Sequence, residues 1–200
     1  MKQLPKFDNY QEEGCCDSGY EALQDFFLSW TLRCSPEKYK EADPKVQEYA
    51  RRIVHALIFG HNLNDKYSIN GEIPNTFKVI QGTTKRQLSS IDLLAEVTTN
   101  ENGLEKKYVL SIENKWYSTL KAGQLKKYND FVQKEFPDAE QVNLFITCDN
   151  CRKYYVSEKE ECRLNHYKYL TIDNLREISK MSTEGETGNA LFDAYWFRKD

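Results

Sequence analysis

The sequence has no excess of positive charge. Its 28 lysines and arginines are outnumbered by 31 aspartates and glutamates, and the formal net charge is −3. This balance excludes proteins that hold nucleic acid through overall charge, such as histone-like proteins, because they need a large basic surplus. Any contact with nucleic acid must therefore come from a local group of basic side chains.

Long apolar stretches are also missing. No segment approaches the roughly 18 apolar residues of a membrane span, and the opening residues, MKQLPKFDNYQEEG, lack the apolar core of a signal peptide. We therefore expect a soluble, cytoplasmic protein without a membrane partner. In a reducing compartment the six cysteines are expected to remain thiols and not to form a disulfide framework.

Internal repeats, low-complexity runs and clear interdomain linkers are absent too. A chain of 200 residues with 40% hydrophobic content suits one domain with its own core, so we expect a single domain over 1–200 with its core at about 18–180. A serine hydrolase is not indicated, because there is no nucleophile elbow and His55 and His61 have no catalytic partner pattern.

The spacing of apolar residues predicts five helices, over 18–34, 42–60, 118–136, 167–181 and 188–200. In the second, Asp43 can cap the start, Pro44 suits the first turn and Gly60 can end the helix. Ser118 is expected to open the third. An acidic residue near the start of the first helix can point inward, because that helix is apolar on two sides.

Segments rich in β-branched and aromatic residues predict four strands, over 76–81, 91–99, 106–115 and 141–148. The last is nearly unbroken in apolar residues, as expected of a strand covered on both faces. A helix separates the third strand from the fourth, which implies a parallel crossover. The predicted fold is therefore α/β, with a mixed central β-sheet flanked by helices.

The dipeptide Asn102-Gly103 suits a two-residue hairpin turn, because both positions tolerate positive φ. Without a bulge, this turn sets Asp92 directly across from Glu113, with their Cβ atoms about 5 Å apart. Lys115 lies two residues after Glu113 and therefore on the same face. The three charged side chains are expected to converge on one patch of the sheet.

Two carboxylates that face each other repel, and both stay ionised only beside a compensating cation. A hard divalent ion meets this need with oxygen ligands and leaves positions for water and phosphate. A nearby lysine can stabilise phosphate charge, or position and deprotonate the attacking water. This combination is suited to phosphodiester hydrolysis, although an acid-x-lysine pair alone is also common on solvated strands.

The segments SSIDLL, SIENK and AGQLKKY together resemble the core of the PD-(D/E)XK nuclease superfamily, which has a restriction-endonuclease-like fold. Gln124 and Tyr128 resemble the Q-x-x-x-Y motif of helicase-associated exonucleases. YEALQDFFLSWTL resembles the first helix of phage- and defence-associated members, whose leading glutamate falls on Glu21; NLFITC and YKYLTIDNLREI resemble later elements. Ser90 and Ile91 stand where the family has a proline near the first acid.

The resemblance implies a site for Mg²⁺ or Mn²⁺. Its ligands would be the carboxylates of Asp92 and Glu113 and the backbone carbonyl of Asn114, and Glu21 would hold a metal-bound water. Glu21 could equally be an exposed acid in the first turn of its helix, favoured by the helix dipole.

The resemblance also implies roles beyond the metal. Lys115 would act on the water or the phosphate, Gln124 would orient Lys115 or the substrate, and Tyr128 would pack or hydrogen-bond beside it. Gln124 and Tyr128 could instead be a pair on a helix surface. Candidate phosphate contacts, each also compatible with an ordinary solvated lysine or arginine, are Lys85, Arg86, Lys121, Lys126 and Lys127.

A second candidate metal site is the pattern C-x2-C-x10-C-x3-H formed by Cys148, Cys151, Cys162 and His166, which is within the range of structural zinc spacings. Some members of the superfamily hold an iron–sulfur cluster through one early and three late cysteines, and Cys15, Cys16 or Cys34 could be the early one. Cys148 ends an apolar strand and the segment after it has little glycine-rich turn chemistry, so we expect neither zinc nor a cluster there.

The sequence thus predicts a metal-dependent nuclease that acts on DNA. A homodimer is the simplest arrangement for cutting both strands of a duplex. Two alternatives remain: a catalytically inactive nucleic-acid-binding or regulatory module on the same fold, and a zinc-stabilised interaction domain. Binding of a divalent metal through the carboxylates would favour the nuclease over the inactive module, whereas binding of zinc through the cysteines would favour the interaction domain.

Overall fold

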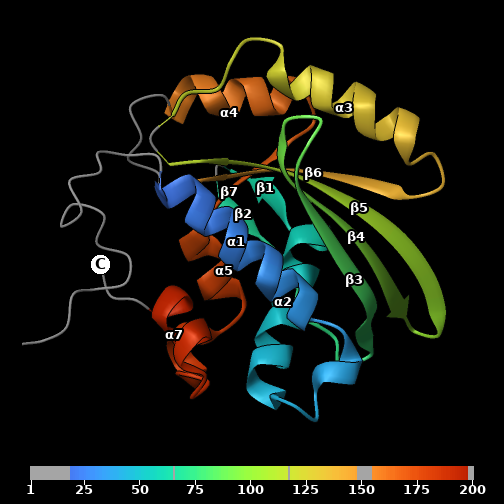
Figure 1. Cartoon of the computed structure of the whole chain (residues 1–200), viewed down its shortest axis with the longest axis vertical. Coiled ribbons are helices and arrows are strands. Elements are labelled where there is room, and N and C mark those ends of the chain that lie inside the picture. Colours follow the sequence, from blue (N-terminus) through green and yellow to red (C-terminus); the bar gives the residue numbers. More distant parts are fainter. Residues whose placement is uncertain (1–18, 65, 117, 148–154, 198–200) are drawn as a thin grey trace, which may run out of the picture.

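A five-stranded mixed β-sheet forms the centre of the molecule (Figure 1). The computed structural model describes residues 19–64, 66–116, 118–147 and 155–197. In sheet order the strands are β3 (Phe77–Leu88), β4 (Ile91–Glu101), β5 (Leu104–Lys115), β6 (Glu140–Thr147) and β7 (Lys168–Thr171). The pairs β3–β4 and β4–β5 are antiparallel, whereas β5–β6 and β6–β7 are parallel. The mixed sheet confirms the predicted α/β class, and the pairing of β5 with β6 confirms the parallel crossover.

Helices cover both faces of this sheet. Figure 1 shows α3 and α4 on one face and α1, α2, α5 and α7 on the other. Their bounds are Gly19–Cys34 for α1, Pro44–Phe59 for α2, Gln124–Glu135 for α3, Tyr155–Leu164 for α4, Ile172–Ile178 for α5 and Ala190–Trp196 for α7. The other described elements are η1 (Glu37–Tyr39), α6 (Met181–Glu184) and a hairpin of β1 (His61–Leu63) and β2 (Lys66–Ser68). None of the described helices is both long and apolar enough to cross a membrane.

The central strands are buried on both faces, because each face carries its own apolar cluster. In β4, Leu93 and Val97 belong to the large core against α1 and α2, whereas Leu94 belongs to a smaller cluster against α3. In β6, Leu144 faces the large core and Phe145 packs in a third cluster on the opposite side, near α4. The nearly unbroken apolar run of β6 is therefore explained by burial on both faces of the sheet, as predicted.

The hairpin between β4 and β5 has the predicted turn and register. Asn102 and Gly103 adopt φ values of 55° and 91°, the left-handed conformation that a two-residue turn of this kind needs. Leu93 pairs with Ile112 at the far end of the ladder. One residue further along this register stand Asp92 and Glu113, and there the Asp92 carboxylate accepts from the backbone N–H of Asn114 at 3.0 Å.

The predicted third helix begins later than expected. It starts at Gln124, not at Ser118, because Gly123 immediately before it adopts a left-handed φ of 74° that no α-helix contains. The residues before Gly123 form a connection between β5 and α3. Gln124 is therefore in the first turn of α3, next to the end of β5.

The region after β6 differs most from the prediction. The helix expected over 167–181 is strand β7 followed by α5, which begins after a capping box at Thr171. Lys168–Thr171 form a strand because they pair in parallel with β6, a contact that local sequence does not reveal. The helix α4 and the hairpin of β1 and β2 were not predicted, and β3 extends to Leu88, well beyond the predicted strand 76–81.

The limits of α2 follow from three residues that the sequence singled out. The Asp43 carboxylate accepts a hydrogen bond from the backbone N–H of Val46 at 3.1 Å, and Pro44 is the first helical residue. Gly60 follows the last turn with an ordinary φ of −66°. A side chain at Gly60 would collide with the Tyr67 ring and with the carbonyl of Ala56, so close packing and not backbone conformation requires glycine here.

His55 on α2 makes the stability of the fold sensitive to pH. Its ring is 7% exposed, packs 4.8 Å from the Phe77 ring, and has no hydrogen-bond partner at Nδ1 among the described residues. Burial, reinforced by the charge of Arg51, lowers its pKa to about 4. The pKa of a histidine in an unfolded chain is near 6.5. Between this pH and about 4, His55 is therefore protonated in the unfolded chain but neutral in the folded protein.

We therefore expect the free energy of unfolding to fall as the pH is lowered from about 6.5 to about 4, by roughly 3 kcal/mol in total from His55 at ~1.4 kcal/mol per pKa unit. Urea unfolding at several pH values would measure this. The His55→Leu variant should lose this part of the pH dependence, and the control His61→Leu should keep it. An unchanged slope in His55→Leu would contradict the assignment.

Candidate active site

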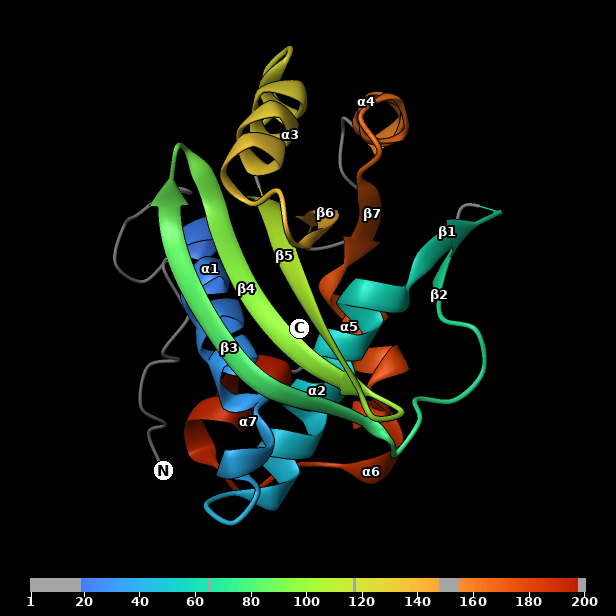
Figure 2. The ribbon, with the colours of Figure 1, turned by 90° about the vertical axis from the view of Figure 1, so that its right-hand side faces the viewer.

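The predicted site residues meet where β5 ends. Because β4 runs antiparallel to β5, the start of β4 with Asp92 lies beside the end of β5 with Glu113 and Lys115. The first turn of α3 covers this point on one face of the sheet, and the first turns of α1 reach it from the other (Figures 1 and 2). Four elements thus position one group of polar side chains.

Lys115 joins the two carboxylates. Its ammonium forms an ion pair with Glu113 Oε1, lies 3.7 Å from Asp92 Oδ2, and donates to the backbone carbonyl of Asn114 at 3.2 Å. The Glu113 side chain is 1% exposed and that of Lys115 is 8% exposed, whereas Asp92 is 19% exposed. Asp92 is therefore the member of the group most accessible from solvent.

The electrostatics of this group follow from burial and mutual proximity. Burial and the neighbouring Asp92 charge raise the pKa of Glu113 well above its usual range, against the effect of Lys115. Burial acts to lower the pKa of Lys115, but the two carboxylates outweigh it and raise that pKa. Glu113 Oε2 has no hydrogen-bond partner among the described residues. A buried carboxylate oxygen in this state is suited to a cation or a proton.

Asp92 is held at both oxygens. Oδ2 accepts from the backbone N–H of Asn114 at 3.0 Å, and Oδ1 accepts from Gln87 Nε2 at 3.2 Å. Gln87 precedes the turn between β3 and β4 and adopts a φ of 55°; Ser89 and Ser90 in the turn are left-handed as well. Gln87 was not among the predicted site residues, because its conformation depends on this turn.

Gln124 and Tyr128 form a chain of hydrogen bonds that ends on Glu113. Gln124 Nε2 donates to Glu113 Oε1 at 2.6 Å and to the Tyr128 hydroxyl at 2.8 Å. That hydroxyl donates to the backbone carbonyl of Ser90 at 2.6 Å, and Gln124 Oε1 accepts from the backbone N–H of Lys121 at 3.1 Å. The structure thus directs both residues toward the site and not toward solvent.

Glu21 lies beyond Lys115, beside the chain that leaves β5. Its carboxylate accepts from the backbone N–H groups of Trp116 at 2.8 Å and Ser118 at 3.1 Å, and from the Ser118 hydroxyl. Burial would raise the pKa of Glu21, but these donors outweigh it and lower the pKa. The inward orientation agrees with the expectation for this helix. A role in holding a metal-bound water stays a prediction.

Gln24, Asp25 and the side chain of Asn114 form a buried group that was not predicted as part of the site. Asn114 receives a hydrogen bond from Gln24 and donates one to Asp25. Burial raises the pKa of Asp25 to about 7, although the bond from Asn114 acts in the opposite direction. The available signal was the inward face of the first helix, which carries Asp25 one turn after Glu21.

The five basic residues predicted as phosphate contacts do not form one surface. Lys85 pairs with Glu96 at 3.4 Å, whereas its neighbour Arg86 lies over the Phe26 ring of α1, so the two occupy opposite faces of β3. Lys126 pairs with Asp130 along α3. Lys121 and Lys127 are exposed near the start of α3, on the side of Gln124.

Within the described ranges, no three His, Cys, Asp or Glu side chains are grouped so that they alone could hold a metal ion. Cys148 and Cys151 of the candidate zinc pattern lie outside those ranges. Cys162 is buried beside Phe145, and burial raises the pKa of its thiol. His166 lines a different cavity from Cys162.

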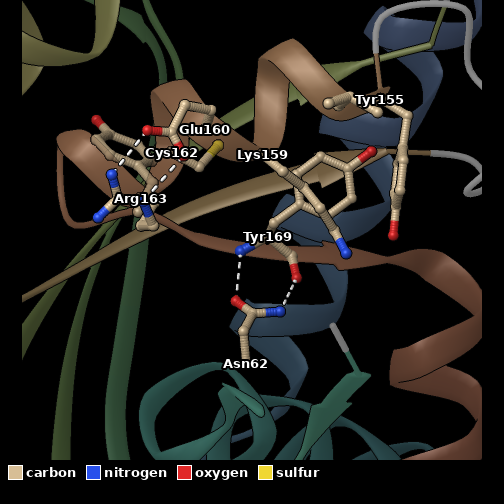
Figure 3. Close-up of a pocket in the computed structure, with 9 residues that line it drawn as sticks. Asn62, Tyr155, Lys159, Glu160, Cys162, Arg163 and Tyr169 are labelled. Carbon is tan, nitrogen blue, oxygen red and sulfur yellow. Dashed lines mark hydrogen bonds and ion pairs between the residues drawn. The ribbon is translucent and has the colours of Figure 1, made fainter. Parts of the chain in front are cut away.

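The cavity next to Cys162 has a volume of about 600 Å³ and lies between α4 and the outer edge of β7 (Figure 3). The Lys159 ammonium stands 4.4 Å from the Tyr155 ring, and the Asn62 amide pairs with the backbone of Tyr169. None of the residues predicted to be catalytic lines this cavity. It is therefore separate from the carboxylate group at the end of β5.

A family model described as the PD-(D/E)XK nuclease superfamily matches residues 21–196. Comparisons with curated proteins and with solved structures find no match. The match begins at Glu21, spans most of the chain and includes the whole group around Asp92, Glu113 and Lys115. Assignment to the phage- and defence-associated branch of the superfamily stays a prediction. The chain belongs to the PD-(D/E)XK nuclease superfamily.

Proposed function

We propose that this protein is a metal-dependent nuclease that hydrolyses phosphodiester bonds in DNA. Membership of the superfamily indicates nuclease-type chemistry. The observation that carries the proposal is the contact of Lys115 with both Glu113 and Asp92 at the end of β5, with Gln124 bonded to Glu113. An arrangement of two carboxylates and one lysine supplies the groups that phosphodiester hydrolysis requires.

The residues fit Mg²⁺ or Mn²⁺. The donors would be the carboxylates of Asp92 and Glu113 and the carbonyl of Asn114, all of them oxygen atoms as a hard divalent ion prefers. Glu113 Oε2, buried and without a partner among the described residues, supports this fit. Such ions commonly keep several waters, so a site with two carboxylates and one carbonyl is sufficient.

When bound, the metal would act as a Lewis acid on the phosphate and lower the pKa of a coordinated water. The ammonium of Lys115, held in its charged form by the two carboxylates, is suited to donate hydrogen bonds from Nζ to the water or to a phosphate oxygen. Gln124 would keep Glu113 in its orientation, and Tyr128 would anchor Gln124 to the carbonyl of Ser90.

Substrate phosphates beyond the cleaved bond would meet basic side chains around the start of α3. Lys121 and Lys127 are exposed there, and Lys126 is on the same helix in an ion pair that a phosphate could replace. Lys85 and Arg86 would reach the nucleic acid from different faces of β3. Each exposed lysine would add a salt-dependent contribution to affinity.

The test is cleavage of labelled single-stranded DNA, double-stranded DNA and RNA by the purified protein with Mg²⁺, Mn²⁺ or EDTA. We expect cutting of DNA that requires the metal and stops with EDTA. Cutting of RNA alone would change the substrate class. Binding of nucleic acid without any cutting would favour the inactive binding or regulatory module, and neither binding nor cutting would contradict the proposal.

A further inference from the structure

One face of α1 contacts a continuous stretch of chain at the end of β5. Glu21, Gln24 and Asp25 are spaced by three and four residues, which places them together on the helix surface. Their partners are Asn114, Trp116 and Ser118. The residue at the middle of the proposed active site, Lys115, lies inside this stretch.

The contacts to Asn114 are made by its side-chain amide. Gln24 Nε2 donates to Asn114 Oδ1 at 2.8 Å, and Asn114 Nδ2 donates to Asp25 Oδ1. Gln24, Asp25 and Asn114 are all buried, with exposures of 1%, 5% and 0%. Since Asn114 points to the opposite face of the sheet from Glu113 and Lys115, none of these contacts touches the proposed metal directly.

The end of β5 needs support on the side of β4. The ladder between β4 and β5 reaches only Leu93–Ile112, and β6 pairs with β5 on the other side as far as Lys115. The backbone of Asn114 nevertheless carries two site contacts: its N–H holds Asp92, and its carbonyl accepts from Lys115. A rotation of this peptide would disturb both.

The chemistry of the group argues against a role in stability alone. Buried amides and carboxylates lose hydration on folding, and replacing both hydrogen-bonded partners with apolar side chains of the same shape can be neutral or stabilising. Gln24 Oε1 is buried and has no hydrogen-bond partner among the described residues, which adds to the cost. Directional hydrogen bonds, in contrast, orient an atom, which is what a ligand-bearing peptide requires.

We propose that Gln24 and Asp25 are positioning residues, which act through the Asn114 side chain to hold the Asn114 peptide, Asp92 and Lys115 in the geometry of the metal site. Glu21 extends the same support to Trp116 and Ser118. The inference rests on the proposed function. The proposed task of α1 is distinct from metal binding, because Gln24 and Asp25 bond to the Asn114 side chain, which lies on the opposite face of β5 from Glu113.

An exchange of partners tests this. Asn114→Asp places an acceptor opposite Asp25 and should lower both Mn²⁺ affinity and the cleavage rate by roughly 10- to 100-fold, the usual effect of losing a residue that orients a metal ligand. The double variant Asp25→Asn/Asn114→Asp restores a donor and an acceptor in exchanged positions, and Gln24 can still donate. We expect it to recover most of both losses.

Mn²⁺ affinity would be measured by electron paramagnetic resonance, cleavage as separate kcat and KM values, and folding as Tm. Gln24→Met removes only the bond to Asn114 Oδ1 and is a milder second variant in case Asn114→Asp does not fold. It should also lower Mn²⁺ affinity. The control is Gln47→Leu, which removes a buried amide of α2 bonded to the Ser35 carbonyl at 2.8 Å, far from the site. It should lower Tm and leave Mn²⁺ affinity and kcat as in the wild type.

Recovery of Mn²⁺ affinity and kcat in the double variant would support the proposal. Recovery of Tm without recovery of these two quantities would overturn it, as would wild-type Mn²⁺ affinity in both Asn114→Asp and Gln24→Met. If the wild-type protein bound Mn²⁺ but cut nothing, only the nuclease proposal would be overturned. The Mn²⁺ affinities of the variants would still show whether Gln24 and Asp25 position the metal site. A wild-type protein that neither binds Mn²⁺ nor cleaves would overturn both.

Discussion

Replacing Lys115 with alanine is expected to lower the rate of cleavage by roughly 10²- to 10³-fold, the usual cost of removing one donor that stabilises charge in a transition state. The variant loses the ammonium that contacts both Glu113 and Asp92. It should remain folded at neutral pH, because the raised pKa of Glu113 lets that carboxyl group take up a proton once its partner is gone. Circular dichroism and single-turnover cleavage would measure the two effects.

The matched control is Lys134→Ala, which removes a lysine that is 82% exposed near the end of α3. This variant should cleave at the wild-type rate. A Lys115→Ala protein that is folded and cleaves within a few-fold of the wild type would show that the lysine takes no part in the reaction, and the assignment of the site would then be wrong.

Mg²⁺ is expected to stabilise the folded protein through Asp92 and Glu113. An ion present at about 100 times its Kd adds ~2.7 kcal/mol to the free energy of unfolding. For a domain of this size that corresponds to a rise in Tm of roughly 5–11 °C, reversed by EDTA. Asp92→Asn and Glu113→Gln keep the shape of each side chain but remove its charge, so each should abolish most of the rise.

Thermal unfolding with and without Mg²⁺ would measure these shifts. Glu140→Gln is a suitable control, since this exposed glutamate lies at the opposite end of the parallel strands and should keep the full rise. If Glu113→Gln showed the same rise as the wild type, the ion would bind elsewhere and the proposed ligand set would be refuted.

The candidate site depends partly on local rules that can be applied to the sequence. Asn102-Gly103 accepts the left-handed conformation of a two-residue turn, and this turn sets the register of β4 on β5 as far as Leu93 and Ile112, the pair next to Asp92 and Glu113. The alternation of side chains along a strand places Lys115 on the same face as Glu113. These statements concern residues that are close in sequence or joined by one hairpin.

Other features could not be predicted in this way. The apolar spacing of 118–136 suggested one helix, but only the conformation of Gly123 decides that α3 begins at Gln124. Strand β7 has four residues and forms by pairing with β6, so its own composition gave too weak a signal. Lys85 and Arg86, both predicted as phosphate contacts, lie on opposite faces of the longer strand β3.

By itself, the sequence determined the fold class, the hairpin register and the group of Asp92, Glu113 and Lys115, because turn chemistry and strand alternation act over short distances along the chain. Only the tertiary structure decided how that group is supported. Gln24 and Asn114 are 90 residues apart, and Gln124, which the family resemblance placed beside Lys115 or the substrate, bonds to Glu113. Contacts of this kind depend on how helices pack against the sheet, and no local pattern of residues encodes that packing.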